Sequence, residues 1–324
     1  MIMTWMRNLD DNKRLNQIVM PGSHDAAMYE TNGVSTFASD AKVITQNLSI
    51  ADQLDAGCRF FDLRVYNKKT GRFGRRANNL YTGHFMEAFG HGKHDQGAYG
   101  PSLATVLDHV SEWIQRDEND GETVILRFSH IKDKWTEAII EAINAAIPLN
   151  YRYRAPQAMA LPMARLPIGP MRGKVIIACT DNFPNLPLRG IHRFYKYGDG
   201  VTGLITCGKY SNTNDYAAMR GGRGRGFFKR KKTGQGQYMD KHNDHQHRAP
   251  IGNPDHIFIL YWTLTGGNIA ETSVPALAGV ANDLCGDHGL LHGQTFTGRM
   301  PNVVLMDFIN DARCQSVYGL NTFP

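Results

Sequence analysis

The chain has 324 residues, of which 42% are hydrophobic and 20% are charged. This length suits one large α/β domain or two small ones, and the composition excludes a disordered or fibrous protein. The formal net charge of +6 favours an anionic partner, such as a nucleic acid, an anionic membrane surface or a phosphate-bearing substrate, although many proteins without such partners are mildly basic.

Membrane-spanning and export signals are not visible in the sequence. No apolar run approaches the roughly 20 residues that a membrane-spanning helix needs. The first residues, Met1–Asp10, lack the basic and then apolar pattern of a signal peptide. We therefore expect a soluble protein, either cytoplasmic or secreted after removal of a leader. The five cysteines show no CxxC or zinc-type spacing, and Cys58, Cys179 and Cys207 lie inside apolar runs, so we expect these three to be buried thiols.

Short apolar runs with strand-like patterns predict eight β-strands. In chain order they lie at Leu15–Met20, Arg59–Val65, Asn79–His84, Thr123–Phe128, Lys174–Cys179, Gly203–Cys207, His256–Trp262 and Asn302–Phe308.

Helical patterns lie between several of these runs. We expect one helix from Ser49 to Gly57 and a second that begins at Ser102, because serine caps helix N-termini and glycine caps C-termini. Two more are expected at about Trp135–Ala146 and Val274–Leu284. The alternation of strands and helices is typical of an α/β protein, and eight parallel strands predict an irregular (β/α)8 TIM barrel.

The second half of this single domain, residues 1–324, is expected to be irregular, because 181–200 and 211–250 show no clear helical pattern. The segment 211–250 contains a basic, glycine-rich run at Arg220–Lys232. Aromatic and cationic side chains together fit contact with an anionic membrane surface. The residues in question are Phe227, Phe228, Lys229 and Arg230. The alternatives are a solvated loop without a ligand, an RNA contact, or a metal site at the histidines of His242–Arg248.

Six ionisable residues lie at or near the C-terminal ends of predicted strands. They are His24 and Asp25 after the first strand, Asp62 and Arg64 on the second, His84 on the third and Asp307 on the eighth. In a closed barrel the eighth strand lies beside the first, so we expect these side chains to converge on the catalytic face. The structural alternatives are an ion pair between Asp62 and Arg64 and a capping role for Asp307.

Two histidines on one face suit the cleavage of a phosphodiester. A neutral imidazole can remove a proton from an attacking hydroxyl, and a protonated one can deliver a proton to the leaving oxygen. Both forms exist near neutral pH, because the reference pKa of histidine is about 6.5. A carboxylate behind each ring fixes its tautomer, and Arg64 can stabilise the phosphoryl oxygens.

Several motifs in chain order resemble the X-domain of phosphatidylinositol-specific phospholipases C, of the bacterial kind and of the small X-domain-only proteins. The matching segments are Trp5–Asp11, Ile18–Asp25, Ser49–Arg64, Gly121–Leu126, Gly173–Ile177 and Asn302–Ile309. The resemblance implies an irregular TIM barrel and a two-step reaction. In the first step the inositol 2-hydroxyl attacks phosphorus, which releases diacylglycerol and a cyclic 1,2-phosphate; water then opens the cycle.

The resemblance also implies a role for each histidine. By position, His24 matches the general base, and Asp307 matches the carboxylate that orients it. His84 matches the general acid, and Asp25 matches its supporting carboxylate.

Arg64 matches the arginine that contacts the phosphate, and Asp62 matches the acidic residue beside it. In the calcium-dependent members of the family a carboxylate occupies the position of Arg64 and helps to hold the metal. A guanidinium there repels Ca²⁺ and does part of its work. We therefore expect no metal and no other cofactor.

The resemblance is weaker where the head group is bound. Tyr210 matches a ring-stacking tyrosine, and Lys209 beside it is a further candidate for substrate binding. Gly208 stands where an acidic residue that bonds the inositol ring is expected, and Ala178–Thr180 stands where an arginine is expected. The catalytic half of the site is thus better supported than the specificity half.

The leading hypothesis is a phosphatidylinositol-cleaving lyase that contacts an anionic membrane peripherally and binds no nucleic acid; lipids of the glycosylphosphatidylinositol type are possible further substrates. Two alternatives stay open. One is a metal-dependent phosphodiesterase on the same barrel that acts on another phospholipid or on a glycerophosphodiester. The other is a catalytically silent module that binds a lipid head group.

Overall fold

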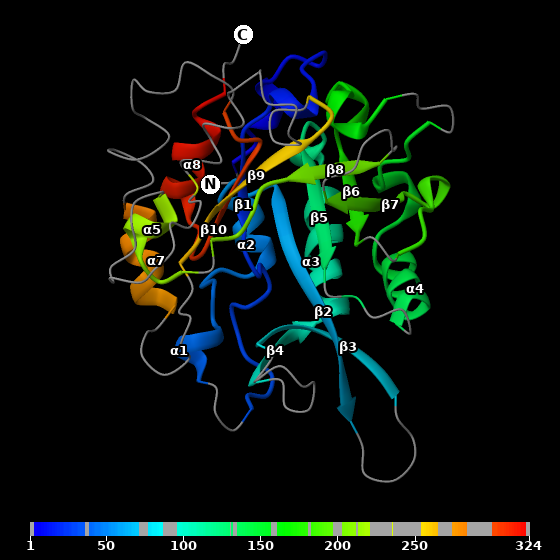
Figure 1. Cartoon of the computed structure of the whole chain (residues 1–324). Helices are drawn as coiled ribbons and strands as arrows, with labels where there is room; N and C mark the ends of the chain where they lie inside the picture. The colour runs from blue at the N-terminus through cyan, green and yellow to red at the C-terminus, as the bar shows by residue number, and fades with distance from the viewer. Residues whose placement is uncertain are drawn as a thin grey trace.

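A computed structural model describes residues 3–35, 39–70, 77–86, 96–129, 131, 135–156, 161–180, 183–196, 203–211, 213–220, 235, 254–264, 274–283 and 300–321. Within these residues, eight parallel strands form a closed barrel with helices around it (Figure 1), which confirms the predicted α/β fold. In order around the barrel the strands are β1 (Met20–Ser23), β2 (Phe60–Thr70), β5 (Thr123–Ser129), β6 (Lys174–Cys179), β7 (Ile191–Lys196), β8 (Leu204–Cys207), β9 (Ile257–Trp262) and β10 (Val303–Met306).

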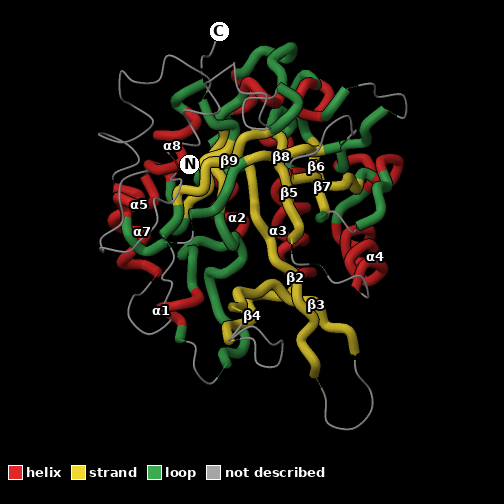
Figure 2. The backbone as a smooth tube through the Cα atoms, in the orientation of Figure 1, coloured by secondary structure: helices red, strands yellow, loops and turns green. Residues whose placement is uncertain are grey.

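The helices pack on the outside of the barrel, and Figure 2 shows them around the strands. They are α1 (Asp40–Val43), α2 (Ile50–Asp55), α3 (Leu103–Ile114), α4 (Thr136–Ala146), α5 (Tyr216–Arg220), α7 (Val274–Asp283) and α8 (Asp311–Tyr318). The predicted caps are confirmed: Ser49 Oγ accepts a hydrogen bond from the Asp52 amide, and Ser102 Oγ accepts one from the Thr105 amide. Gly57 follows α2 with a φ of 103°, a conformation that favours glycine.

Strand alternation separates two apolar layers. On β2, Phe61 and Leu63 face the helices, whereas Phe60 faces the barrel interior, where it packs with residues such as Ile125 and Ile176. This alternation follows from the two-residue period of a strand. Because Asp62 and Arg64 have the same phase as Phe60, they continue the interior line above the apolar layer, toward the C-terminal end of the strand.

The predicted strand at Asn79–His84 is real but does not belong to the barrel. It lies in β3 (Ala77–Met86), which pairs antiparallel with the second half of β2 and with β4 (Gln96–Ser102). These strands form an extension at the C-terminal end of β2, seen in the lower part of Figure 1. Thus His84 reaches the site from an antiparallel arm rather than from the end of a barrel strand.

Two further expectations about strands were wrong. Leu15–Gln17 forms a 3-10 helix, and the first strand begins only at Met20, because polar Asn16 and Gln17 interrupt the apolar alternation. The barrel strand β7 lies within 181–200, where no element was expected. Its sequence, Ile-His-Arg-Phe-Tyr-Lys, has too few apolar residues to show a strand pattern.

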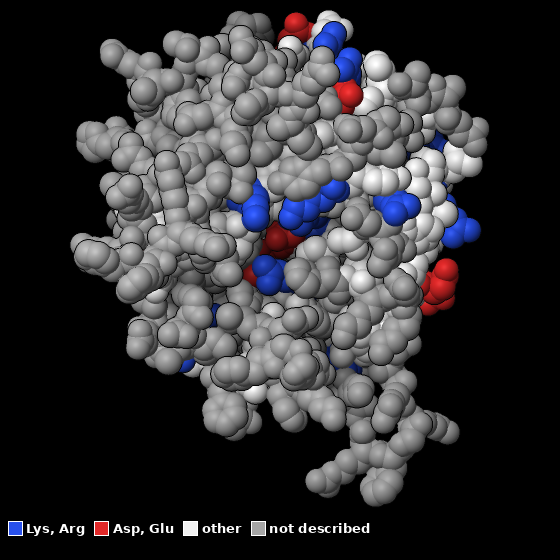
Figure 3. Space-filling model, viewed as in Figure 1, with Lys and Arg blue, Asp and Glu red and all other residues white. Residues whose placement is uncertain are grey.

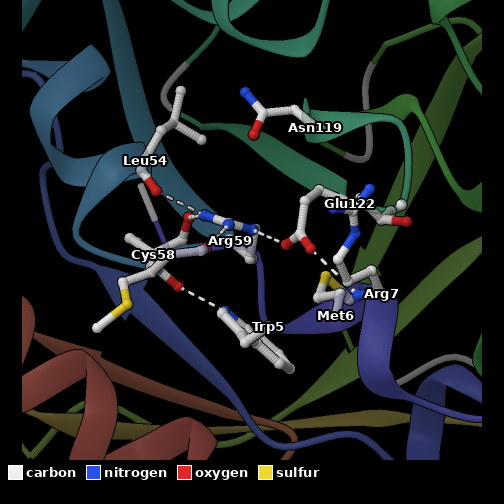
Figure 4. Close-up of polar contacts among 12 residues, drawn as sticks. Trp5, Met6, Arg7, Leu54, Cys58, Arg59, Asn119 and Glu122 are labelled. Carbon is white, nitrogen blue, oxygen red and sulfur yellow. Dashed lines mark hydrogen bonds and ion pairs between the residues drawn. The ribbon is translucent and has the colours of Figure 1, made fainter. Parts of the chain in front are cut away.

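A buried ion pair lies near the N-terminal ends of β2 and β5 (Figure 4). Arg59, just before β2, places Nε 2.8 Å from Glu122 Oε2, and both side chains are fully buried. The guanidinium also donates to the carbonyl oxygens of Leu54 and Cys58 and lies 4.5 Å from the ring centroid of Trp113. These contacts satisfy the buried charge and tie the residues before β2 and β5 together.

Four of the five cysteines lie in the described residues. Cys58, Cys179 and Cys207 are buried thiols, as expected, and Cys314 is buried too; no disulfide joins the described cysteines, and Cys285 lies outside the described residues. Among the described helices, none is both long and apolar enough to cross a membrane.

Candidate active site

The C-terminal end of the barrel carries the predicted ionisable residues. Figure 3 shows basic and acidic side chains next to one another in a hollow near the middle of the face viewed in Figure 1. All six predicted residues lie close together, and the side chains of both histidines and of Asp25 and Asp307 are at most 6% exposed.

His24 and Asp307 come from neighbouring strands. The His24 amide donates to the Met306 carbonyl at 3.0 Å, so the residues after β1 and β10 are held side by side. His24 Nδ1 lies 2.8 Å from Asp307 Oδ1. When this nitrogen carries the proton and donates it to the carboxylate, Nε2 keeps its lone pair on the opposite edge of the ring. Asp307 therefore contacts the His24 ring, and the N-cap of the helix that follows is Asn310.

Asp25 contacts both histidines and an arginine. Its Oδ2 lies 2.7 Å from His84 Nδ1 and 3.7 Å from His24 Nε2, and its Oδ1 lies 2.5 Å from Arg64 Nε. Because both rings contact the same carboxylate oxygen, they border the same small volume. Asp25 has a φ of 41°, a left-handed conformation that is rare outside glycine and costs energy.

The charges around His24 favour its imidazolium form. Burial alone would lower the pKa of His24, but the carboxylates of Asp25 and Asp307 outweigh burial and the repulsion of Arg64, and they raise it to about 9. Burial would likewise raise the pKa of Asp25, but Arg64 and the two histidines hold it well below its usual range. The Asp25 carboxylate therefore stays ionised at neutral pH, and together with Asp307 it stabilises a proton on His24.

Arg64 lies between Asp25 and His24. Its Nη2 is 3.4 Å from His24 Nε2, and its side chain is 19% exposed, so the guanidinium borders the open side of the site. The ion pair considered for Asp62 and Arg64 is not the one formed. Arg64 pairs with Asp25, while Asp62 Oδ1 lies 3.5 Å from Arg127 Nη1 and accepts a hydrogen bond from Ser129 Oγ at 3.4 Å.

Arg127 was missed by the sequence analysis. It is the basic residue of β5, directly beside Asp62 of β2 in register. The sequence does contain an indication of its role. Arg127 is the one charged residue of an apolar strand, and a charged side chain that points into the barrel needs a partner on a neighbouring strand.

Tyr210 lies beside His24, and its predicted contact with the inositol ring stays a prediction. Its ring centroid is 6.0 Å from that of His24, with 22° between the planes, and 5.9 Å from that of Tyr261. Lys209 is exposed, and its role in substrate binding stays a prediction. Buried Gln235 links the segment of Tyr210 to β9: its side-chain amide donates to the Lys209 carbonyl, and its side-chain oxygen accepts from the Tyr261 amide.

Gly208 cannot be replaced by the acidic residue expected there without a change in the backbone. It has a φ of 119°, and a Cβ at this position would lie 2.1 Å from the Ile259 carbonyl oxygen. In the second place where the sequence departs from the family, Ala178 of β6 lies in register with Arg127. An arginine thus stands next to the expected position, on the neighbouring strand.

A second missed residue, Gln46, joins the two loops that carry His24 and Asp307. Its fully buried amide donates to the carbonyl oxygens of His24 and Met306, and its oxygen accepts from the Ile309 amide. Thr45 beside it donates to the Asp25 carbonyl. Polar residues of this kind carry no periodic signal, so the sequence alone gave no reason to select them.

Two predictions remain, which concern metal binding and membrane contact. The atoms of His24, Asp25 and Asp62 that can bind a metal lie within 4.8 Å of one another. Both oxygens of Asp25 are, however, already close to Arg64 or His84, which leaves a cation in competition with a guanidinium. The predicted membrane-contact residues lie outside the described part of the chain; they are Phe227, Phe228, Lys229 and Arg230. So do the histidines of His242–Arg248.

Comparisons with known proteins agree with the resemblance seen in the sequence, although no family model matches the chain. A 1-phosphatidylinositol phosphodiesterase of Listeria monocytogenes is 27% identical over 190 residues, which cover 57% of this chain and 50% of that protein. A PI-PLC X-box domain-containing protein of Dictyostelium discoideum is 30% identical over 132 residues, which cover 37% of this chain and 15% of that protein. The chain thus spans half or less of the length of these curated relatives.

Solved structures give the same result for the fold. The phosphatidylinositol-specific phospholipase C of Listeria monocytogenes matches with a TM-score of 0.63 and 18% identity, over 99% of this chain and 98% of that one. A Staphylococcus aureus enzyme of the same name has a TM-score of 0.61 and 17% identity, over 98% and 97% of the two chains. In sequence and in fold, the chain is similar to the phosphatidylinositol-specific phospholipase C X-domain family.

Proposed function

We propose that this chain, as a relative of the phosphatidylinositol-specific phospholipase C X-domains, cleaves the phosphodiester of phosphatidylinositol. The products are diacylglycerol and inositol 1,2-cyclic phosphate. The observation that carries the proposal is the contact of both His24 and His84 with Asp25 Oδ2, with the guanidinium of Arg64 beside them. Relatives named 1-phosphatidylinositol phosphodiesterase support the choice of substrate.

In the first step His24 acts as the general base. Its Nδ1 is held by Asp307, and in the molecules whose His24 ring is neutral, a fraction that grows as pH rises toward about 9, Nε2 takes the proton of the inositol 2-hydroxyl as that oxygen bonds to phosphorus. The imidazolium that forms is stabilised by Asp307 and Asp25, the same carboxylates that raise the pKa of His24. The bond between phosphorus and the glycerol oxygen breaks on the opposite side of the phosphorus.

His84 acts as the general acid. Its Nδ1 faces Asp25, so the proton on Nε2, at the other edge of the ring, is available to the leaving oxygen of diacylglycerol. The carboxylate behind the ring fixes the orientation of the imidazole. In a second step the roles reverse, as His84 removes a proton from water and His24 protonates the 2-oxygen of the opened cycle.

Arg64 replaces a metal ion in this proposal. The guanidinium can donate hydrogen bonds to the non-bridging phosphate oxygens while Nε pairs with Asp25. Negative charge that shifts within the phosphoryl group then meets a fixed positive charge. We therefore propose that the reaction requires no divalent cation.

The substrate is presented at a membrane surface, so the enzyme is proposed to act as a peripheral protein on anionic lipid. Contact through the basic segment of 211–250 remains a prediction from the sequence. Lipids of the glycosylphosphatidylinositol type contain the same inositol phosphodiester, and they fall within the same proposal when their glycan fits the site.

The test follows diacylglycerol release from vesicles of phosphatidylinositol and from vesicles of phosphatidylcholine, with and without EDTA. We expect release from phosphatidylinositol alone, unchanged by EDTA, and loss of release in His24→Ala and His84→Ala. His109→Ala, a half-buried histidine of α3, is the matched control and should keep full activity. Binding without release would indicate a silent head-group module, and loss in EDTA that Ca²⁺ restores would indicate the metal-dependent alternative.

A further inference from the structure

A cavity with a cationic wall lies at the N-terminal end of the barrel, whereas the candidate active site lies at the C-terminal end. Its volume is about 420 Å³, which is within the range of small-molecule sites. Lys174 begins β6, and Arg152 pairs in parallel with Val175, the next residue of that strand. The length of β6 therefore separates this cavity from the level of the catalytic residues.

Three cationic side chains belong to the wall of this cavity, and none of them pairs with a carboxylate within the described part of the chain. They are Arg152, Arg154 and Lys174. Other described arginines, such as Arg59 and Arg172, do form such pairs. The described residues of the wall also include no aspartate or glutamate, so the positive charge of the cavity is not balanced locally.

Arg152 is the most buried of the three cations, with 4% of its surface exposed. Its Nε donates to the Ile147 carbonyl at 2.7 Å, and its Nη1 donates to Asn144 Oδ1 and to the Arg189 carbonyl at 2.7 and 3.0 Å. These acceptors are all neutral. Burial lowers the pKa of Arg152, and no described carboxylate offsets that effect. Because a guanidinium stays charged in a protein, an anion bound beside it stabilises this buried charge.

The other two cations keep donors available for a ligand. Lys174 Nζ donates to the Asn150 carbonyl at 2.6 Å and lies 6.0 Å from the ring centroid of Tyr151. An ammonium has further hydrogens beside the one used here. Arg154 is exposed, and its guanidinium forms no hydrogen bond with the described residues. Such a guanidinium can bind two phosphate oxygens at once.

The rest of the wall is largely apolar and is fixed to the barrel. The Tyr153 amide donates to the Val175 carbonyl at 2.9 Å, and the Tyr153 carbonyl accepts from His192 Nε2 of β7 at 2.8 Å. A ligand that covers this part of the wall removes apolar surface from water. The apolar and aromatic residues of the wall are Tyr153, Pro156, Leu166, Pro167 and Pro170.

We propose that this cavity binds a small phosphorylated organic molecule. Its phosphate contacts Arg152, Arg154 and Lys174, and its apolar portion lies against Tyr153 and the prolines. A phosphate ester carries a charge of about −1.5 to −2 near pH 7, which balances several cations better than a single carboxylate does. The cavity is separate from the proposed phospholipase site, so the two sites can be tested independently.

The experiment titrates the full chain with phenyl phosphate, inorganic phosphate and benzyl alcohol by isothermal titration calorimetry. We expect phenyl phosphate to bind with a Kd on the order of 0.1 mM, as is typical of a ligand of this size. Inorganic phosphate lacks the ring and should bind about 10-fold more weakly. Benzyl alcohol lacks the charge and should not bind. Equal binding of both phosphates, binding of the alcohol as tight as that of phenyl phosphate, or no binding of phenyl phosphate would overturn the proposed ligand.

Substitutions in the wall locate the binding site. Arg154→Gln and Lys174→Gln should each weaken phenyl phosphate about 10-fold, the typical effect of a hydrogen bond to a charged group. Arg189→Gln, which removes an exposed arginine outside the described wall, is the matched control and should bind as the wild type does. Unchanged binding in both wall variants would overturn the proposed site.

Because the candidate active site can also bind a phosphate, the same titration is carried out with Arg64→Gln. This variant should keep its affinity for phenyl phosphate, since the cavity lies at the other end of the barrel. Binding that is lost in Arg64→Gln and kept in Arg154→Gln and Lys174→Gln would place the ligand in the active site. That result would overturn the proposed cavity site and leave the proposed phospholipase activity in place.

Discussion

Asp307→Asn changes one charge in the site while it preserves the shape of the side chain. The carboxylate lies 2.8 Å from His24 Nδ1, and it is one of the two that raise the pKa of His24 to about 9. An ion pair at such a distance typically changes a pKa by about 1 to 3. We therefore expect the pKa of His24 to fall by about that amount in the variant, while Asp25 continues to raise it.

Two measurements follow this change. The ring nitrogens of His24 can be titrated by NMR in 15N-histidine-labelled protein, and kcat/KM can be measured against pH. We expect the limb of the bell-shaped profile near pH 9 to move to lower pH and kcat to fall about 10²- to 10⁴-fold, the range for an acid–base group. The limb of a pH profile does not by itself identify the residue that titrates, so the NMR titration assigns the change to His24.

The same substitution changes how stability depends on pH. Because the pKa of His24 is higher in the folded state, its contribution to stability is fully present below about pH 6.5 and is lost as pH rises through about 9. A rise in pKa to about 9 corresponds to roughly 3 kcal/mol. Urea unfolding should show this loss in the wild type and a smaller one in Asp307→Asn. An unchanged titration of His24 in the variant would refute the assigned charge coupling.

Three other substitutions test other parts of the structure. Glu122→Gln leaves the fully buried charge of Arg59 without its partner, and urea unfolding should show a loss of about 3–5 kcal/mol while kcat of the folded protein stays within about twofold. Gln46→Ala removes three hydrogen bonds between the loops of His24 and Asp307. It should lower kcat more than it changes KM, and an effect on KM alone would contradict a positioning role. Gly208→Asp forces a Cβ to within 2.1 Å of a backbone oxygen, so a melting temperature equal to that of the wild type would contradict the observed backbone.

The closed barrel and most of its helices could be predicted because their signals are local. Ser49 and Ser102 form the expected caps, and Thr123–Phe128 and Lys174–Cys179 are apolar enough to read as buried strands. The strand β7 could not be found, because His192 and its polar neighbours hide the alternation. The predicted number of eight barrel strands is correct only because two errors cancel. The antiparallel strand β3 was counted as a barrel strand, and the barrel strand β7 was missed.

The candidate residues His24, Asp25 and Asp307 were found because they follow strand ends, but the partner of Asp62 and the supporting glutamines were not. Which arginine pairs with Asp62 depends on the register of β2 and β5, and the sequence does not state which strands are neighbours. Gln46 and Gln235 act through hydrogen bonds to distant backbone groups, and a lone glutamine in a loop has no pattern that indicates such contacts. Arg127 could have been predicted as a site residue, because it is a charged residue at a position of β5 that points into the barrel.

The acid–base pair can be tested most directly through the first product of the reaction. Phosphorus NMR should follow the wild type with phosphatidylinositol in detergent and EDTA. Transfer of the 2-oxygen to phosphorus predicts an early resonance of a five-membered cyclic phosphate, which forms before any inositol 1-phosphate and fails to form with His24→Ala. Direct appearance of the open monoester, with no cyclic species at any time, would contradict attack by the ring hydroxyl and with it the role assigned to His24.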